Sequence, residues 1–396
     1  MVKTNGVVKK YYLFNHPKLD ILFLGLFIVI CPISTALSGI VGDRSLSNYV
    51  AIIYCLFSLV RLLFLRKIRI IKECTIVYIY LLYAIVSFLW NPFFLFDWYF
   101  VTFFFTVAIV FLSSLLDYTD KDYHFLNGCI VVSFIVSLLA FVFNIHHLYA
   151  GRILITISST MDPNDFGGGL SLILSYLLFQ LSKTKRKLLI LPILIVALMM
   201  IMTGSRGSII MFLSAIIVWL FFIRGRIKVI HIVLIFVIIA ISIFFVEKFL
   251  PDTIIERLSV GALLTDQGSG RLGIWKAAWQ RFSQFNRIQV LFGSGHGSFA
   301  NTVAYRPGGR LIPYRAHNIF VNELIEGGIV GELLLVLCLM KLLIRSYNNR
   351  NLLGFLIIVC FIVEGLSLDV QAYRIMSLAF FYAILPEKSK QSVFSI

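Results

Sequence analysis

Long apolar runs recur along this chain and are separated by short polar stretches. Twelve such runs can be marked, at 20–38, 49–65, 75–91, 99–117, 125–143, 166–182, 188–203, 207–223, 229–246, 318–343, 352–370 and 374–386. A bilayer core of about 30 Å needs roughly 20 apolar residues in a helix, so each run is predicted to cross a membrane. The runs are continuously apolar, whereas a membrane β-barrel requires alternating residues, so a barrel is excluded.

Composition indicates the same class of protein. Of the 396 residues, 60% are hydrophobic and 14% are charged, which is unlike a soluble domain of this size. We therefore expect an all-α polytopic membrane protein with about twelve transmembrane helices. Residues 1–246 are expected to hold helices one to nine, residues 247–316 one large external loop, and residues 317–396 helices ten to twelve.

Positive charge marks one side of the predicted membrane. The N-terminal stretch is rich in lysine, and further basic clusters stand at 66–72, 183–187, 224–228 and 341–350. The opposite short loops hold only four arginines, which are Arg44, Arg152, Arg206 and Arg374. The positive-inside rule then places the clusters and both termini in the cytoplasm. The net charge of +16 therefore reports topology, and no nucleic-acid partner is expected.

The large external loop has a basic excess, with nine Lys and Arg against four Asp and Glu between residues 247 and 315. Within it, "GRLGIWKAAWQRFSQF" (270–285) is predicted to be an amphipathic helix. Its expected apolar face comprises Leu272, Trp275, Ala278, Trp279 and Phe282. Two alternatives remain open for this helix. It can rest on the lipid surface, or Arg271 in its first turn can face a phosphate.

Two outward-facing turns carry polar residues beyond what helix ends require. In "SSTMDPNDFGGG" (158–169), Asn164 or Asp165 can cap the following helix, but capping does not explain the whole cluster with Asp162. In "MTGSRGS" (202–208), Arg206 begins an apolar helix and opposes the helix dipole there. A headgroup-binding arginine and an anion-binding arginine are both compatible with this position.

A third stretch, "FGSGHGSF" (292–299), alternates glycine with other residues. A backbone nest for phosphate is conceivable, but a plain turn is favoured because no helix pattern follows. His296 in this turn is a minor candidate.

The apolar run at 318–343 begins with unusual polar chemistry. Asn318, Asn322 and Glu326 share one stripe at helical spacing, with Glu323 beside it. Polar groups at membrane depth are unfavourable and usually face a protein interior or a wet cavity. His317 stands at the helix entrance, and histidine accepts a proton near neutral pH. These residue types together favour catalysis.

The motifs resemble those of the O-antigen polymerase/ligase superfamily of bacterial membrane glycosyltransferases (the Wzy and WaaL type). The matching pieces are "DPNDFG", "TGSRGS", "GSGRLGIW" and above all "AHNIFVNELIEGGIVG", and they span residues 158–331. A further similarity is the arginine that ends "LDVQAYR" (368–374).

The resemblance implies a GT-C-like transferase that takes a glycan from undecaprenyl pyrophosphate and hands it to an acceptor hydroxyl. His317 would be the general base, and the pyrophosphate would be bound by Arg206, Arg271, Arg315 and Arg374. The substrate-binding candidates are Asp162, Asn164, Asp165, Asn318, Asn322, Glu323 and Glu326. No cofactor and no metal is expected. The expected partners are the undecaprenyl-pyrophosphate-linked oligosaccharide, membrane lipid and a chain-length regulator.

The family resemblance leaves three activities open. A polymerase, which extends the glycan on another lipid-linked repeat unit, is favoured over a ligase that moves it to lipid A-core. The alternative from another class is a transporter of lipid-linked sugars, which the glutamates within the apolar runs keep open. The expected location is the bacterial inner (plasma) membrane, with the active site on the periplasmic or extracellular side.

Overall fold

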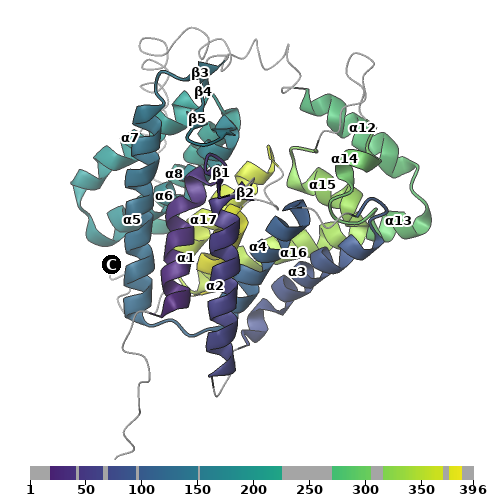
Figure 1. The fold of residues 1–396 in the computed structure, drawn as a ribbon, viewed down its shortest axis with the longest axis horizontal. Helices are drawn as coiled ribbons and strands as arrows, with labels where there is room; N and C mark the ends of the chain where they lie inside the picture. Colours follow the sequence, from purple (N-terminus) through teal and green to yellow (C-terminus); the bar gives the residue numbers. More distant parts are fainter. Residues whose placement is uncertain are drawn as a thin grey trace, which may run out of the picture.

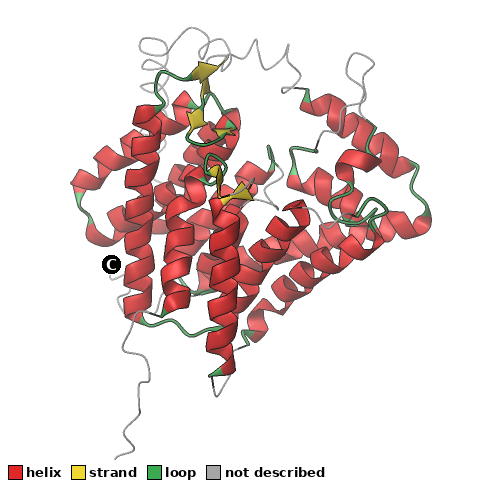
Figure 2. Cartoon of the chain, viewed as in Figure 1, coloured by secondary structure: helices red, strands yellow, loops and turns green. Residues whose placement is uncertain are grey.

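The computed structural model describes residues 18–41, 44–65, 70–94, 98–149, 152–224, 270–304, 315–368 and 374–385. This part of the chain is almost entirely helical, with three two-stranded antiparallel hairpins (Figure 2). The helices are α1 (Leu19–Ile30), α2 (Leu46–Leu63), α3 (Thr75–Val86), α4 (Trp98–Leu115), α5 (Asp120–Phe143), α6 (Pro163–Thr184), α7 (Ile190–Met202), α8 (Arg206–Arg224), α12 (Arg271–Ser283), α13 (Arg287–Phe292), α14 (Phe299–Thr302), α15 (Ile319–Glu326), α16 (Gly328–Asn348), α17 (Leu352–Gly365) and α18 (Arg374–Ile384).

Short elements connect these helices. The 3-10 turns are η1 (Cys31–Ile33), η2 (Lys72–Cys74), η3 (Ser87–Trp90) and η4 (Lys187–Leu189). The hairpins pair β1 (Ser38–Val41) with β2 (Arg44–Ser45), β3 (Leu148–Tyr149) with β4 (Arg152–Ile153), and β5 (Ile155–Thr156) with β6 (Thr160–Met161).

Each apolar run that lies wholly or largely in described residues contains an α-helix, and the run at 229–246 lies outside them. Within the described residues, three helical stretches are long and apolar enough to cross a membrane by length and composition, namely Leu46–Leu63, Lys72–Trp90 and Asp120–Phe143. The helical class is therefore as expected. The count of twelve spans and the GT-C-like arrangement stay predictions.

One predicted helix is wrong in its continuity. The run at 318–343 is divided into α15 and α16 at Gly327 and Gly328, and Gly328 has a φ of +64° that a continuous helix does not allow. Apolar periodicity alone cannot reveal such a break, because both halves keep a helical pattern.

The helices pack as a bundle with a smaller group at one side (Figure 1). Helix α1 packs on α2 and α5, and α17 packs on α6, α8, α16 and α18. Helices α3 and α16 lie against each other and lead toward α12, α13, α14 and α15 (Figure 1). The group formed by α12, α13 and α14 is thereby attached to the bundle through α15 and α16.

Three successive glycines at the start of α6 allow close packing on three sides. A Cβ on Gly167 would lie 1.9 Å from Ser208 Oγ in α8, and one on Gly168 would lie 1.4 Å from the Glu364 carboxylate in α17. A Cβ on Gly169 would lie 2.5 Å from the Pro32 Cα in η1. Successive helical residues point in different directions, so each glycine admits a different neighbour.

Two ion pairs connect α1, α2 and α5 at the end of the bundle opposite to the start of α6. Arg61 Nη1 lies 2.6 Å from Asp20 Oδ2, joining the end of α2 to the start of α1. Lys18 Nζ lies 2.7 Å from Asp122 Oδ2 at the start of α5. These pairs lie at the end that the basic clusters predict to be cytoplasmic.

Candidate functional site

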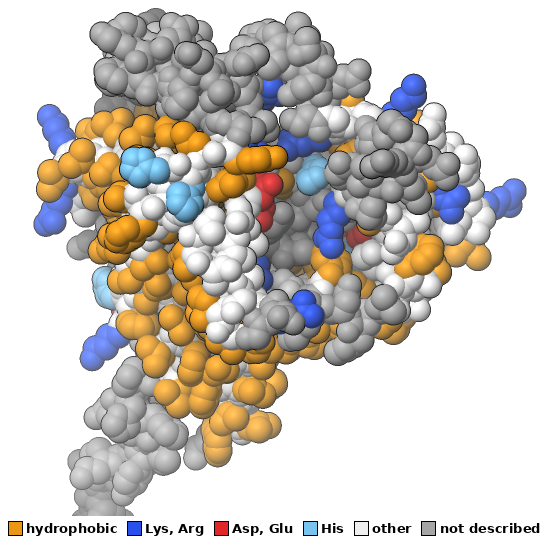
Figure 3. Space-filling model, turned by 45° about the horizontal axis from the view of Figure 1, so that its top comes forward, with side chains coloured by type: hydrophobic (Ala, Val, Ile, Leu, Met, Phe, Trp, Pro, Cys, Tyr) orange, Lys and Arg blue, Asp and Glu red, His pale blue; other side chains and the backbone are white. Residues whose placement is uncertain are grey.

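The described helices α2, α6, α8, α15 and α18 begin at one end of the bundle, where α1 and α17 finish. We call this region the polar end. Figure 3 shows acidic, basic and histidine side chains gathered around the middle of the face seen there, whereas hydrophobic side chains cover much of its sides.

Arg152 joins two of these helix starts. Its Nε donates to the Thr203 carbonyl at 2.9 Å, in the turn that leads into α8. Its Nη2 donates to Asn164 Oδ1 at 2.8 Å, in the first turn of α6, and lies 3.8 Å from Asp162 Oδ1. The "DPND" and "TGSRGS" elements are therefore in direct contact through one guanidinium. Arg206, as the first residue of α8, stands at this junction.

The turn after α17 joins the start of α8 to one further helix start, that of α15. A Cβ on Gly207 would lie 2.4 Å from Ser367 Oγ, so the first turn of α8 lies against this turn. Asn318 Nδ2 donates to the Leu366 carbonyl at 3.2 Å, which places the start of α15 on its other side. His317 therefore lies at the polar end with Arg206.

Asp165 and Arg374 line one small cavity, and Glu364 lines it with them. Arg374 begins α18, and its Nη2 donates to Asn48 Oδ1 at 3.0 Å near the start of α2. Two carboxyl groups and a guanidinium thus lie together beside the glycine-rich start of α6.

His317 is held between two fixed neighbours. Asn318 caps α15, because its Oδ1 accepts from the amides of Phe320 at 2.9 Å and Val321 at 3.1 Å. The buried Ala316 accepts a hydrogen bond at 2.8 Å from Trp275 Nε1. Between them His317 has a φ of +49°, in the left-handed region that non-glycine residues rarely adopt.

The same bond to Ala316 places Arg271 near this entrance, because Arg271 begins α12 one turn before Trp275. Arg315 is exposed, and its guanidinium carbon lies 3.9 Å from the centre of the Tyr99 ring. That contact is a cation–π interaction, which holds the arginine at the edge of α4.

The buried face of α12 differs from the expected one. Ile274 and Ala278 are buried, whereas Leu272 is 54% exposed and Trp279 is 66% exposed. The helix turns Ile274 inward because it packs on α15, and this tertiary contact is invisible in the helix's own periodicity.

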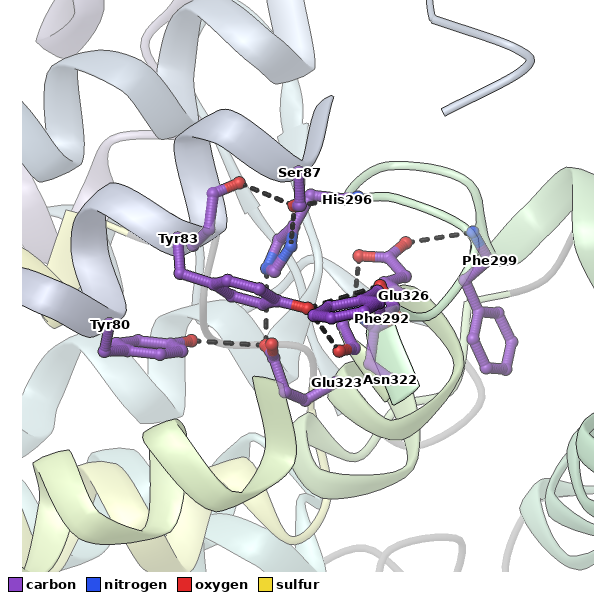
Figure 4. A network of polar contacts seen from close by, with 11 residues as sticks. Tyr80, Tyr83, Ser87, Phe292, His296, Phe299, Asn322, Glu323 and Glu326 are labelled. Carbon is purple, nitrogen blue, oxygen red and sulfur yellow. Dashed lines mark hydrogen bonds and ion pairs between the residues drawn. The ribbon is translucent and has the colours of Figure 1, made fainter. Parts of the chain in front are cut away.

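Asn322, Glu323 and Glu326 do not lie at the polar end but belong to a buried network (Figure 4). We call it the His296 network. His296 Nδ1 lies 2.7 Å from Ser87 Oγ, and its Nε2 lies 3.3 Å from Glu323 Oε2. Tyr80 donates to the same carboxylate oxygen at 3.2 Å. The side chains of His296 and Glu323 are fully inaccessible to solvent.

Glu326 completes the network. Its Oε1 accepts from the Phe299 amide at 2.9 Å, and its Oε2 accepts from Asn322 Nδ2 at 3.0 Å. These partners give the carboxylates internal roles, and substrate binding by Asn322, Glu323 and Glu326 stays a prediction.

Protonation of His296 is favoured by its surroundings. Burial acts to lower the pKa of His296, but the carboxylates of Glu323 and Glu326 outweigh it and raise the pKa above its ordinary value of 6.5. When protonated, His296 pairs with Glu323 and so fixes the glycine-containing turn against η3 and α15.

The turn at 292–299 also closes the break between α15 and α16. The amides of Ser294 and Gly295 donate to the carbonyls of Ile325 at 3.0 Å and Glu326 at 2.8 Å, which end α15. A Cβ on Gly293 would lie 2.2 Å from the Glu326 carbonyl oxygen. Because these two amides serve the helix end, the structure favours the turn over the phosphate nest.

The importance of two polar residues for the structure of this region was not evident from the sequence. Arg152 was noted only as one of four arginines on the outer side, and the contacts that make it a junction join residues up to 51 positions apart. His296 looked minor because its partners Ser87 and Glu323 lie in distant apolar helices.

Residues 191–336 match the family model Wzy_C, described as O-antigen ligase. The match covers less than half of the chain and includes the candidate residues from Arg206 to Glu326. It confirms the resemblance to the O-antigen polymerase/ligase superfamily and supports glycosyl transfer of that type by a membrane protein. A search of curated proteins found no match.

Proposed function

We propose that this chain is a membrane glycosyltransferase of the O-antigen polymerase/ligase type. It transfers a glycan from undecaprenyl pyrophosphate to an acceptor hydroxyl at the outer face of the membrane. The main observation in support of this proposal is that several helices begin together at the polar end, where His317 lies with Arg206, Asp165 and Arg374. Arg271 and Arg315 belong to the same entrance through Trp275 and Ala316.

The chemistry requires a base and a stabiliser of negative charge. His317 removes the proton from the acceptor hydroxyl, whose oxygen attacks the anomeric carbon of the donor glycan. The bond from that carbon to the diphosphate oxygen breaks, and undecaprenyl diphosphate leaves with the bonding electrons. Guanidinium groups bind this departing charge bidentately, and the starts of α8 and α18 add positive dipole ends.

Two independent arguments support a location of the polar end on the outer side of the membrane. The positive-inside pattern assigns the starts of α2, α6, α8, α15 and α18 to the outer side. The contacts between these helices gather the same ends at the polar end. A bacterial inner (plasma) membrane location with cytoplasmic termini is part of the proposal.

Among the superfamily activities we favour polymerase. Both substrates of a polymerase are anionic lipid diphosphates, and the external segment at 247–315 carries nine basic against four acidic residues. A ligase acting on lipid A-core is the second candidate. A transporter is less well supported, because His317, Arg206, Asp165 and Arg374 lie at helix ends assigned to the outer side rather than at mid-membrane.

The test is a gel of the surface glycans from a strain in which the His317→Ala variant replaces the wild-type protein. A surface glycan of one repeat unit, with normal protein level, supports polymerase, and free lipid-linked polymer supports ligase. Arg287→Ala, an exposed residue in α13 outside the polar end, is the matched control and retains the full ladder. A normal ladder from His317→Ala contradicts the proposal, and a glycan trapped on the inner leaflet favours transport.

A further inference from the structure

A groove outside the proposed transfer site lies beside the start of α6. It has a volume of about 460 Å³ and is lined by Tyr149, Arg152, Leu154, Thr160, Met161, Asp162 and Pro163. Two hairpins, β3–β4 and β5–β6, supply its walls. The space exceeds what one bound water molecule needs and is in the range of small-ligand sites.

One wall of the groove is an aromatic ring next to a guanidinium. Tyr149 and Arg152 are directly opposite in the antiparallel pair of β3 and β4, so their side chains lie on the same face of the hairpin. Tyr149 is 71% exposed, although it is a large aromatic residue. Its ring therefore offers a face that is largely open to solvent and that the described residues leave uncovered.

The polar groups of the groove are fixed before any ligand arrives. Arg152 is held by the Thr203 carbonyl and Asn164, and its side chain is only 12% exposed. Asp162 accepts from the Asn164 amide at 2.7 Å, and its side chain is 56% exposed. A carboxylate and a guanidinium are thus held at 3.8 Å from each other, beside the aromatic ring.

We propose that this groove is a subsite for a sugar ring of the glycan, distinct from the point of transfer. A sugar ring has an apolar face of C–H groups that stacks on an aromatic side chain, and hydroxyl groups at its edge. The Asp162 carboxylate accepts hydrogen bonds from these hydroxyls, and the Arg152 guanidinium donates to ring or carboxylate oxygens. This inference rests on the proposed function.

The position of the groove fits a growing glycan. Arg152 binds Thr203, three residues before Arg206, and Asp162 stands three residues before Asp165. A sugar on Tyr149 therefore lies next to the arginine proposed to bind the diphosphate, so that one extended glycan reaches both. Sugar rings of the donor glycan and of the acceptor glycan could both bind in this way, and kinetic measurements distinguish the two.

The first experiment measures turnover of the lipid-linked repeat unit by the purified full-length protein. Tyr149→Ala is expected to raise KM roughly three- to tenfold with kcat nearly unchanged, and Tyr149→Phe to keep the wild-type KM. Asp162→Asn, which preserves the helix cap, is expected to raise KM as well. Leu148→Ala, on the same strand with its side chain on the other face, is the matched control and leaves KM unchanged.

The substrate whose KM rises identifies the bound glycan. With the elongated donor held saturating, a rise in KM for the single repeat unit assigns the subsite to the acceptor. With the acceptor saturating, a rise in KM for the donor assigns it to the donor. An unchanged KM in both arms overturns the subsite.

A binding measurement separates failure of the subsite from failure of the proposed function. The probe is the repeat-unit oligosaccharide freed from its lipid, observed by saturation-transfer NMR on His317→Ala protein. Saturation of sugar protons that disappears on adding Tyr149→Ala supports the subsite. If the saturation is undiminished after Tyr149→Ala is added, the subsite proposal is wrong. The transferase proposal is judged separately, because it is supported when His317→Ala alone abolishes turnover.

Discussion

His317 adopts a backbone conformation that is unfavourable for any residue with a side chain. Its φ of +49° persists because Ala316 is bound to Trp275 and Asn318 caps α15 on the other side. Strain of this kind is retained where the surrounding structure over-determines it, and it is frequent at functional sites. The strained backbone at His317 is therefore better explained by a role in function than by a contribution to stability.

Glycine at this position is expected to relieve the strain. The His317→Gly variant should be at least about 1 kcal/mol more stable than His317→Ala, because glycine adopts positive φ without steric cost. Both variants should be inactive. Thermal unfolding in detergent measures the difference.

Arg350 provides the control for that comparison, because it also has a positive φ, of +52°, and lies away from the polar end. Arg350→Gly should likewise be more stable than Arg350→Ala, but both should remain active. A less stable His317→Gly would show that the backbone there is not strained.

Substitution of Arg206 at the polar end distinguishes a requirement for positive charge from a requirement for bidentate hydrogen bonding. Arg206→Ala should abolish long glycans, since a charge that binds the diphosphate is removed. Arg206→Lys should keep part of the activity if charge dominates, and little if the bidentate fork is required. Glycan ladders from cells with matched protein levels distinguish these cases. A full ladder from Arg206→Ala would leave the residue only a role in binding lipid headgroups.

His296 links stability to pH. Its pKa is raised in the folded protein above the 6.5 of an unfolded chain, so protonated His296 stabilises the fold. That contribution is complete below about pH 6.5 and is lost as the pH rises through the raised value. The unfolding temperature in detergent should therefore be highest below about pH 6.5 and fall as the pH rises above it.

The groups that face His296 are Glu323, Glu326 and Ser87, and Tyr80 donates to the Glu323 carboxylate. His296→Gln should weaken the pH dependence and lower stability, because removing one partner of a buried pair leaves Glu323 uncompensated. His146→Gln, at an exposed site, should keep the wild-type profile. An unchanged profile in His296→Gln would assign the titration to another group.

At the scale of elements, glycine decides how closely helices approach. Gly169→Ala should destabilise the protein by about 1–3 kcal/mol, because its Cβ would lie 2.5 Å from the Pro32 Cα and backbone cannot move aside. Gly128→Ala in α5 is the matched control, since no atom lies within 4 Å of its Cβ position. There alanine should be neutral or stabilising.

The measurement for both variants is the unfolding midpoint in one detergent. Equal midpoints for Gly169→Ala and Gly128→Ala would mean that α6 and η1 can separate without loss.

Helix positions were readable from the sequence, but helix interruptions were not. The apolar runs in described residues contain α-helices, because a polypeptide in lipid must satisfy its own backbone hydrogen bonds. The break at Gly327 depends on amides of Ser294 and Gly295, about 30 residues earlier, which replace the missing helical partners. Long-range contacts of this kind leave no local pattern.

The same limit applies to the candidate site. Polar residues at helix starts were recognisable because they stood out against apolar surroundings, as with Arg206 and His317. Arg152 and His296 became significant only through partners elsewhere in the chain. Which face of α12 is buried was likewise decided by α15 and not by the periodicity of α12.

At the scale of the whole molecule, the orientation of the bundle can be tested with cysteine labelling. All six native cysteines are buried, so the background is low. Leu148→Cys at the polar end should react with a membrane-impermeant maleimide on intact cells. Arg186→Cys, exposed between α6 and α7, should react only after the membrane is opened. The reverse pattern would place the site on the cytoplasmic side and contradict the proposal.

The junction made by Arg152 has a consequence for how the protein can be divided. It joins the starts of α6 and α8, which both precede residue 225 in the chain, whereas His317 and Arg374 follow residue 270. If the chain is cut between these two positions, each fragment holds only part of the candidate site. Neither fragment alone can assemble the complete set of groups. Two separately expressed fragments should each be silent, and turnover should return only when they recombine in the same bilayer.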